Sequence, residues 1–420
     1  MTSTTQTMRK AGAAQGWTLA SANWLSVIAT SAITPVLMMI TKHFAGTPGL
    51  EVKIDLLSTI PALFVAICAF PAGWLADRIG GRKVLLIAVG LYGFMGCAPM
   101  VLDNLNAIVV TRAGVGILEA AIMTVTTALV GDYFHGNERE RWLAVQTGGA
   151  SVIATLTVLV CGALGDVKGL MFEGWRLPFG LYGFGFILFF LCLFLVWTPT
   201  DKEKHAALAA HVDREAAAGK SEPHDDKPFS WGQMVPIYLV TFYVSTAFYV
   251  LLIKLAAILG ERHYEVGATI GTVMAVMSVC MALGAVIFKF MKTPTSGKMA
   301  LSFAFSAIGF CTVAFSQHLL GVTIGSAITG FGSGMALPTM ITYTISKLPM
   351  RFRARGMGLW QASFFVGQFA SPLIITLLGN AIGGLSNAVK AYSGFMAVAF
   401  VLAVVTLIKG GSKAVLVEAE

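Results

Sequence analysis

Long hydrophobic stretches alternate with short polar segments along almost the whole chain of 420 residues. A run of about 20 apolar residues is long enough to cross a bilayer as an α-helix, so the pattern predicts membrane-spanning helices joined by short loops. The predicted helices, twelve in all, cover residues 17–41, 54–76, 83–102, 106–131, 142–165, 176–198, 233–259, 266–290, 299–317, 319–346, 355–380 and 389–409. Pro35 is expected to bend the first helix near its end.

A longer polar segment divides these helices into two sets of six. Residues 199–229 are rich in charged residues, alanine, histidine and proline, and we interpret them as a linker that is partly helical over residues 202–218. The linker separates an N-terminal bundle, residues 1–198, from a C-terminal bundle, residues 230–420. The predicted fold class is an all-α membrane protein of two pseudo-symmetric six-helix bundles.

Composition and charge support a membrane protein and predict its orientation. Hydrophobic residues make up 56% of the chain and charged residues only 12%, whereas an average soluble domain is about 25% charged. Of the 29 Lys and Arg residues, 21 fall in segments on the side of the termini and linker, 6 in the opposite loops and 2 within predicted helices. This asymmetry predicts cytoplasmic termini in an inner (plasma) membrane, and it explains the net charge of +8 without a nucleic-acid partner.

The loop between the second and third predicted helices carries four charges and three glycines within eleven residues. Glycines permit a tight turn, and the charges will not enter hydrocarbon. Six of its residues resemble the loop signature of the major facilitator superfamily, Gly-x-x-x-Asp-Arg-x-Gly-x-Arg-(Arg/Lys): Gly73, Asp77, Arg78, Gly80, Arg82 and Lys83.

The resemblance implies twelve helices and a transporter that rocks its two bundles about a central site. It also implies that the loop is a cytoplasmic gating element. In that family the loop aspartate, here Asp77, holds the N-terminal bundle to the inner end of the eleventh helix when the cavity opens outward. Asp132, at the end of the fourth predicted helix, is expected to pair with Arg78 or Arg82.

Ionisable residues inside a membrane span indicate function by default. Arg112 and Glu119 are seven residues apart, so both face the same side of the fourth predicted helix. The segment Arg112-x-Gly114-x-Gly116 resembles the family's fourth-helix signature, whose arginine is linked to proton coupling in proton-driven members. We therefore expect Arg112 and Glu119 to couple transport to protons; the alternative is a structural ion pair within the bundle.

Six further residues are predicted to bind substrate. Each also has a structural alternative, since polar residues in spans often serve helix packing and a lysine near a helix end can reach the headgroups. The aromatic runs, including Phe364-Phe365, are interpreted as packing. The substrate candidates are Asn23, Thr30, Tyr243, Lys254, Gln361 and Gln368.

Motifs of other functional classes are missing from the sequence. It has no phosphate-binding loop of the form Gly-x4-Gly-Lys-Ser/Thr, no catalytic triad in a convincing context, and six cysteines that all lie in apolar runs without metal-ligand spacing. We expect no enzyme activity, no metal and no cofactor, with a proton gradient as the energy source. A membrane enzyme or receptor that reuses the fold would need a catalytic cluster or a large soluble domain.

The direction of transport is predicted from resemblance. The second to fourth helices resemble exporters, which favours proton antiport of a small amphiphilic or anionic compound by a monomer in the lipid bilayer. The fifth helix lacks the exporters' Gly-x-x-x-Gly-Pro-x-x-Gly-Gly pattern. Because Arg112 and Lys254 would suit a negative charge, proton symport of an organic anion such as a carboxylate is the alternative.

Overall fold

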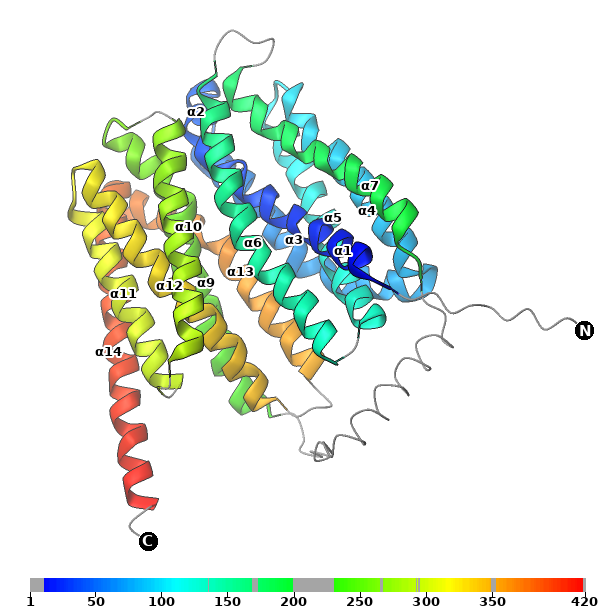
Figure 1. Cartoon of the computed structure of the whole chain (residues 1–420). Helices are drawn as coiled ribbons and strands as arrows, with labels where there is room; N and C mark the ends of the chain where they lie inside the picture. The colour runs from blue at the N-terminus through cyan, green and yellow to red at the C-terminus, as the bar shows by residue number, and fades with distance from the viewer. Residues whose placement is uncertain are drawn as a thin grey trace, which may run out of the picture.

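The computed structural model describes residues 11–134, 136–167, 173–198, 230–264, 267–291, 293, 295–348 and 353–417. The predicted all-α membrane fold is confirmed (Figure 1). Within the described residues, eleven helical segments are long and apolar enough to cross a membrane. The last helix adds a shorter apolar stretch, Leu385–Val401, so the structure has room for the twelve predicted spans.

The first half of the chain forms one group of helices. Pro35 lies in a short 3-10 turn that separates the first two α-helices, as expected for a residue that cannot donate a backbone hydrogen bond. The elements of this half are α1 (Ala13–Ser31), η1 (Thr34–Val36), α2 (Leu37–His43), α3 (Leu50–Ile79), α4 (Gly81–Cys97), η2 (Ala98–Met100), α5 (Leu105–Tyr133), α6 (Gly136–Gly165), η3 (Gly174–Gly183) and α7 (Phe184–Leu195).

The second half forms a group of six helices, with α10 and α11 packed against α12. The predicted linker, residues 199–229, lies outside the described residues, and so does its predicted helix over 202–218. The elements of this half are α9 (Trp231–Glu261), α10 (Gly267–Phe290), α11 (Thr295–Phe315), α12 (Leu319–Lys347), α13 (Arg353–Ile382) and α14 (Leu385–Val417).

Two faces of the molecule can be told apart by the ends of the helices. We call the side where α7 ends and α9 begins the linker face, and the side where α2 ends and α3 begins the distal face, which is uppermost in Figure 1. The two halves meet mainly through α3 with α13 and α6 with α10. These four helices therefore form the boundary at which any movement between the bundles must occur.

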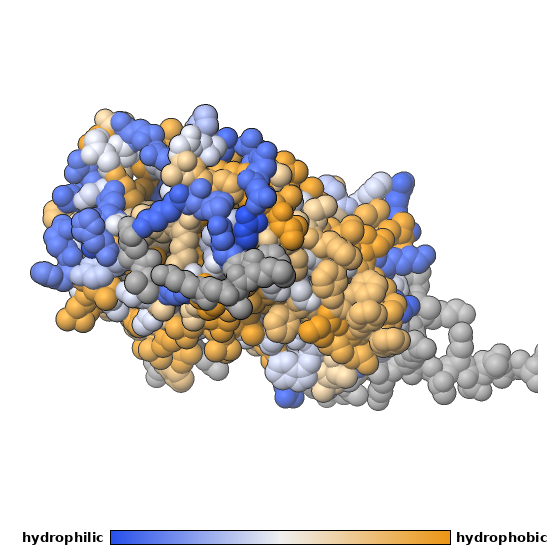
Figure 2. All heavy atoms as spheres, turned by 90° about the horizontal axis from the view of Figure 1, so that it is seen from above, coloured by the Kyte–Doolittle hydropathy of each residue, from blue (hydrophilic) through white to orange (hydrophobic). Residues whose placement is uncertain are grey.

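The sides of the molecule are apolar. In Figure 2, which looks onto the distal face, hydrophilic residues gather over the ends of the helices and hydrophobic residues along their sides. Large side chains that no other part of the protein covers include Phe70 (84% exposed), Phe194 (79%) and Phe290 (74%). Such residues are costly in water and suited to lipid, so the exposed apolar belt is the surface that the bilayer covers.

Candidate functional site

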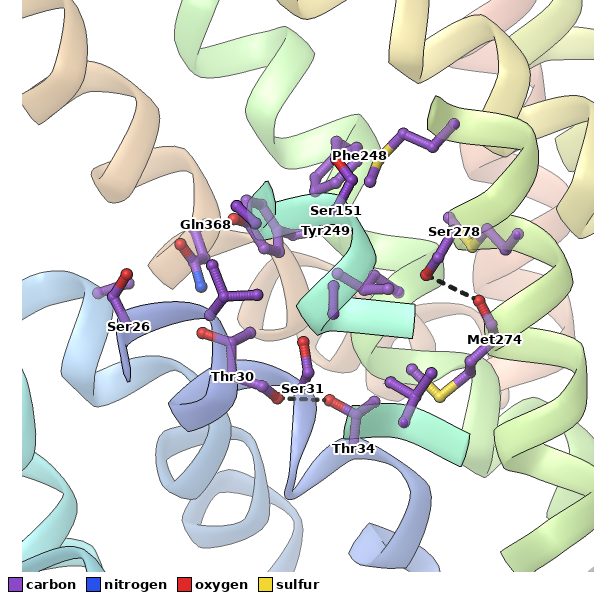
Figure 3. Close-up of a pocket in the computed structure, with 18 of the residues that line it drawn as sticks. Ser26, Thr30, Ser31, Thr34, Ser151, Phe248, Tyr249, Met274, Ser278 and Gln368 are labelled. Atoms are coloured by element: carbon purple, nitrogen blue, oxygen red, sulfur yellow. Dashed lines mark hydrogen bonds between the residues drawn. The ribbon is translucent and has the colours of Figure 1, made fainter. Parts of the chain in front are cut away.

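A cavity of about 250 Å³ lies between the two bundles (Figure 3). Elements α1, η1, α3, α5 and α6 line it from the first half, and α9, α10 and α13 line it from the second. Concave, largely apolar sites with a few polar groups are typical of small-molecule binding. The cavity's position at the boundary means that a bound molecule would contact both bundles at once.

Hydroxyl groups line the wall formed by α1 and η1. Ser26, Thr30 and Thr34 recur every four residues and so share one face of the helix, with Ser31 beside them. The Thr34 Oγ1 donates to the Thr30 carbonyl at 3.0 Å and the Ser26 Oγ donates to the Asn23 carbonyl at 2.8 Å. These hydroxyl oxygens keep their acceptor capacity, so the wall can still accept hydrogen bonds from a ligand.

The opposite wall is aromatic and sulfur-rich. Phe248 and Tyr249 come from α9, and Phe364 and Phe365 come from α13. Phe364 stands at the centre of a cluster, since its ring lies 5.7 Å from that of Tyr249 and is stacked 5.6 Å from that of Trp360. Phe364 and Phe365, which the sequence led us to interpret as packing residues, thus line the cavity. Methionines contribute further apolar surface to the cavity: Met123, Met274, Met277 and Met281.

Two buried polar side chains of the cavity lack partners. Glu119 is 4% exposed and Gln368 is 3% exposed, and both line the cavity. The Oε1 atom of each makes no hydrogen bond. Because buried polar atoms are nearly always satisfied in folded proteins, these two groups are the ones most readily explained by a ligand or a proton.

Arg112, the other half of the predicted coupling pair, is occupied elsewhere. Its guanidinium donates to the Leu57 carbonyl at 3.2 Å, the Ala29 carbonyl at 2.9 Å and the Tyr182 hydroxyl at 2.5 Å. It makes no ion pair with Glu119, although both lie on α5. Arg112 is 1% exposed and ties together α1, α3, α5 and η3, a linkage that sequence reasoning did not anticipate.

Lys254 also has a partner that was not foreseen. Its ammonium group forms a salt bridge with Asp55 of α3 and donates to the Thr376 hydroxyl of α13 at 2.7 Å. The Thr376 hydroxyl in turn donates to the second oxygen of Asp55 at 2.5 Å. Asp55 is 1% exposed and Lys254 is 9% exposed. We call these three residues the distal gate, because they join the two bundles on the distal side of the cavity.

Asp55 was missed because of its place in the sequence. It is the second residue of the predicted helix 54–76 and follows the charged residues Glu51 and Lys53, so it resembles the polar border of a span. The helix in fact begins at Leu50, which places Asp55 more than one turn inside it. An acidic residue inside an apolar helix was the signal that could have identified it.

Other contacts join the bundles near the same face. Asp166, at the end of α6, accepts a hydrogen bond from the backbone amide of Ala268 at 2.6 Å, where the free amides at the start of α10 favour a carboxylate. Further along this pair of helices, a Cβ atom at Gly271 would lie only 2.7 Å from the Val158 carbonyl oxygen. The close fit of α6 and α10 therefore depends on the glycine, and the distal face is closed in this structure.

Three other substrate candidates lie away from the cavity lining. The Asn23 amide donates to the Thr126 hydroxyl at 3.2 Å, between α1 and α5. The Tyr243 hydroxyl donates to the Phe395 carbonyl at 3.1 Å, which fixes α9 to α14. Gln361 is exposed. Of the six candidates, the structure brings Thr30 and Gln368 to the cavity together with Glu119.

The glycine-rich loop lies on the linker face. Gly80 has φ of +93°, a conformation that favours glycine, and it turns the chain between α3 and α4. Arg82 donates to the Leu193 carbonyl at 2.6 Å, and Arg78 lies 4.2 Å from the ring of Trp74. Four more residues complete the set predicted for gating: Gly73 and Asp132 are half-buried, while Asp77 and Lys83 are exposed.

Among the described residues, the structure shows no hydrogen bond or ion pair between Asp77 and the linker-face end of α13. The Gly356 carbonyl at that end instead accepts a hydrogen bond from Tyr238 within the second bundle, at 3.2 Å. The prediction concerned a cavity open to the opposite side, so it stays a prediction for that state.

Comparison with known proteins agrees with this architecture. A profile of the family described as "Major Facilitator Superfamily" matches residues 19–299 and 267–416. The chain is 24% identical over 343 residues to the "Gallate transporter" of Pseudomonas putida, covering 76% of this chain and 74% of that protein. It is 27% identical over 191 residues to the "Quinolone resistance protein NorB" of Staphylococcus aureus, and this match covers 44% of this chain and 37% of that protein.

A solved transporter structure resembles the fold of this chain. A bacterial homolog to the human lysosomal transporter Spinster, in an inward-facing and occupied conformation, superposes with a TM-score of 0.73 at 17% sequence identity. The match covers 94% of this chain and 97% of that chain. At this identity the likeness concerns the fold.

Proposed function

Since the chain belongs to the major facilitator superfamily of membrane transporters, we propose that it is a proton-coupled secondary transporter that exports a small amphiphilic molecule by antiport. The observation that carries the proposal is the buried carboxyl group of Glu119, which has an unpartnered oxygen and lines a cavity between two bundles. The protein acts as a monomer in the inner (plasma) membrane, with the linker face in the cytoplasm. It needs no cofactor and has no enzyme activity.

Alternating access requires the closed side to open in turn. The distal gate is the contact that must break for the cavity to reach the distal side, because it joins α3 to α9 and α13. On opening, both charges of the gate become hydrated, which offsets the loss of their mutual attraction. At the same time the loop from Gly73 to Lys83 engages the other bundle on the linker face.

Glu119 is the proton carrier in this proposal. A carboxyl group in a cavity of low polarity is costly to ionise unless a cation or hydrogen-bond donors support it. Arg112 makes no hydrogen bond to Glu119, since its donors are directed to Leu57, Ala29 and Tyr182, and its charge acts on the carboxyl group only from a distance. Glu119 therefore exchanges a proton with whichever side the cavity faces, and Arg112 holds the surrounding helices in place.

The similarity to the gallate transporter favours a second candidate function, proton symport of an organic anion. In that case a carboxylate and a proton would enter the cavity together, and the proton on Glu119 would remove the repulsion between two negative groups. Against this candidate, Lys254 is paired with Asp55 and neither Lys254 nor Arg112, the cations that suggested it, lines the cavity.

Proton movement tests the proposed function. Purified protein is placed in liposomes loaded with a pH-sensitive dye, and norfloxacin or gallate is added outside. The pH of the lumen should change as the substrate enters. A rise in luminal pH indicates antiport, and a fall indicates symport. Glu119→Gln should still exchange substrate for substrate but should move no protons. The matched control is Glu51→Gln, at an exposed acid on α3.

Two outcomes would overturn the proposal. Equal proton movement by the wild type and Glu119→Gln would exclude Glu119 as the carrier. Substrate flux without proton movement in the wild type would exclude proton coupling altogether.

A further inference from the structure

We infer that the cavity takes a small aromatic molecule that carries a protonated nitrogen, with the nitrogen at Glu119 and the ring against α9 and α13. The inference rests on the proposed function and adds the chemical class of the substrate. It starts from the charge of the wall: among the described residues that line the cavity, Glu119 is the one charged group. A ligand that lacks positive charge would leave this carboxylate uncompensated.

The two basic residues nearest to this site, Lys254 and Arg112, place no cationic group on the cavity wall. Lys254 is bound to Asp55 and Thr376 in the distal gate, and Arg112 donates to two carbonyl groups and a hydroxyl. Neither of them lines the cavity. An organic anion would thus meet a carboxylate on the wall and no cation within the lining, and two like charges in a site of low polarity repel each other strongly.

The polar atoms left free in the cavity suit a hydrogen-bond donor. The Glu119 Oε1 is an acceptor without a partner, and an ionised carboxylate can only accept. The Gln368 side chain can turn to present either its oxygen or its nitrogen, so it adapts to the ligand and does not select its charge. An ammonium group supplies the N–H donors that Glu119 lacks, in a charge-assisted bond.

The aromatic wall suits the rest of such a molecule. Phe248, Tyr249, Phe364 and Phe365 face the hydroxyl-bearing α1 across the cavity, and Figure 3 shows Tyr249 and Gln368 on the side opposite Thr30 and Ser31. Aromatic faces attract both a flat ring and a nearby cation. The flexible methionines beside them can adjust to ring systems of different shape.

Binding of a cation and binding of a proton compete for Glu119 in this arrangement. The charged and titratable groups around Glu119 are Arg112 on its own helix, Tyr92 on α4, Tyr182 in η3 and Tyr249 on α9. The tyrosines are neutral near pH 7 and arginine stays charged, so Glu119 is the group that titrates. Cation affinity should therefore fall as the pH falls, because the protonated carboxyl no longer attracts the ligand.

Three ligands that share a biphenyl ring system test the inference: 4-phenylbenzylamine, 4-phenylbenzyl alcohol and 4-phenylbenzoate. Calorimetry on the detergent-purified full chain at pH 8 should show the amine binding about tenfold or more tightly than the alcohol, as expected for one hydrogen bond to a charged group. The benzoate should bind more weakly than the alcohol. Titrations in two buffers of different ionisation enthalpy should show proton release on amine binding at pH 6.

Variants separate the charge from the fold of the cavity. Glu119→Gln should remove the preference for the amine and its pH dependence, whereas Phe364→Ala should weaken all three ligands. Glu51→Gln should behave as the wild type, and each variant must first elute and melt as the wild type does. The inference is overturned by a benzoate that binds as tightly as the amine, by an unchanged amine preference in Glu119→Gln, or by the failure of all three ligands to bind.

Transport assays distinguish this failure from that of the proposed function. In liposomes, 1-methyl-4-phenylpyridinium, a permanent aromatic cation, should exchange for protons through the wild type. Binding of the amine at Glu119 without any such exchange would refute the proposed transport mechanism and leave the binding inference standing. Proton-coupled flux of gallate with no amine binding would refute the binding inference and leave proton-coupled transport standing.

Discussion

Arg112 and Glu119 share one face of α5, yet the structure gives them opposite surroundings. Each nitrogen of the arginine side chain donates a hydrogen bond, to Leu57, Tyr182 or Ala29, while the Oε1 of the glutamate has none. A fully bonded buried group stabilises the fold, and an unbonded one costs free energy that a proton or ligand can recover. The two residues therefore act through different means, one by positioning helices and the other by binding.

Replacing Arg112 should accordingly affect stability before it affects coupling. Arg112→Met removes three hydrogen bonds and leaves the Leu57 carbonyl and the Tyr182 hydroxyl without the arginine donor, whereas the Ala29 carbonyl still accepts from Tyr182. The cost is about 1–3 kcal/mol for each group that stays unsatisfied. Tyr182→Phe removes two hydrogen bonds, the one from Arg112 and the one to the Ala29 carbonyl, but leaves the guanidinium on Leu57 and Ala29, so it should cost less, about 1–2 kcal/mol. Thermal unfolding of both variants in detergent would show this order. An Arg112→Met variant that melts with the wild type but moves no protons would instead give Arg112 a direct part in coupling.

Sequence reasoning found the free carboxylate but not the arginine's partners. A polar residue in an apolar helix is visible in the sequence, which is why Thr30, Glu119 and Gln368 were candidates and all three lie on the cavity. Which of them is satisfied depends on neighbours that the fold supplies. The Tyr182 hydroxyl is 70 residues away from Arg112 along the chain, and no local pattern links the two.

The helices themselves were predictable, because their length and apolar character are local properties. The break at Pro35 followed from the chemistry of proline. Contacts between helices were not predictable in the same way: Asp55 is 199 residues from Lys254 and 321 residues from Thr376. The distal gate is a product of packing α3 against α9 and α13, and a single sequence carries no signal for that packing.

The distal gate predicts how the bundles respond to loss of one charge. Lys254→Met leaves Asp55 buried without its cation, which should destabilise the closed distal face by about 3–5 kcal/mol and so open it. In a cysteine-free background, a cysteine at Ser58, one turn from Asp55 and 6% exposed, should then react faster with a membrane-impermeant maleimide. The double variant Asp55→Asn/Lys254→Met should return the rate toward that of the parent, since no unpaired charge remains.

Equal labelling in the parent and Lys254→Met would show that the ion pair does not hold the distal face closed. Labelling could instead be faster in the double variant than in the single variant. That result would show that the gate is closed by the attraction between the two charges, and that a buried unpaired Asp55 does not by itself open it.

The whole molecule combines an apolar belt with an uneven distribution of basic residues. The 21 Lys and Arg residues on the side of the termini and linker, against 6 on the other, favour a cytoplasmic linker face. With the two bundles meeting at α3–α13 and α6–α10, this expected orientation would place the distal gate on the side that faces away from the cytoplasm. A transporter in this state would receive cytoplasmic molecules, as export requires.

Reporter fusions can check this orientation. Green fluorescent protein fused after Glu420 should fluoresce and alkaline phosphatase fused there should be inactive, because the C-terminus is expected in the cytoplasm. Alkaline phosphatase fused after Gly46, in the loop between α2 and α3, should be active. The opposite pattern at both positions would invert the orientation and, with it, the direction of proposed transport.

A single acidic side chain among the described residues of the cavity also limits the energetics of transport. If Glu119 holds either one proton or one monovalent cation, each complete exchange moves no net charge, and the cycle is electroneutral. The membrane potential, worth about 2.3 kcal/mol per charge at 100 mV, would then contribute nothing for such a substrate. The steepest gradient the protein could build would match the pH difference alone, a factor of about ten for each pH unit.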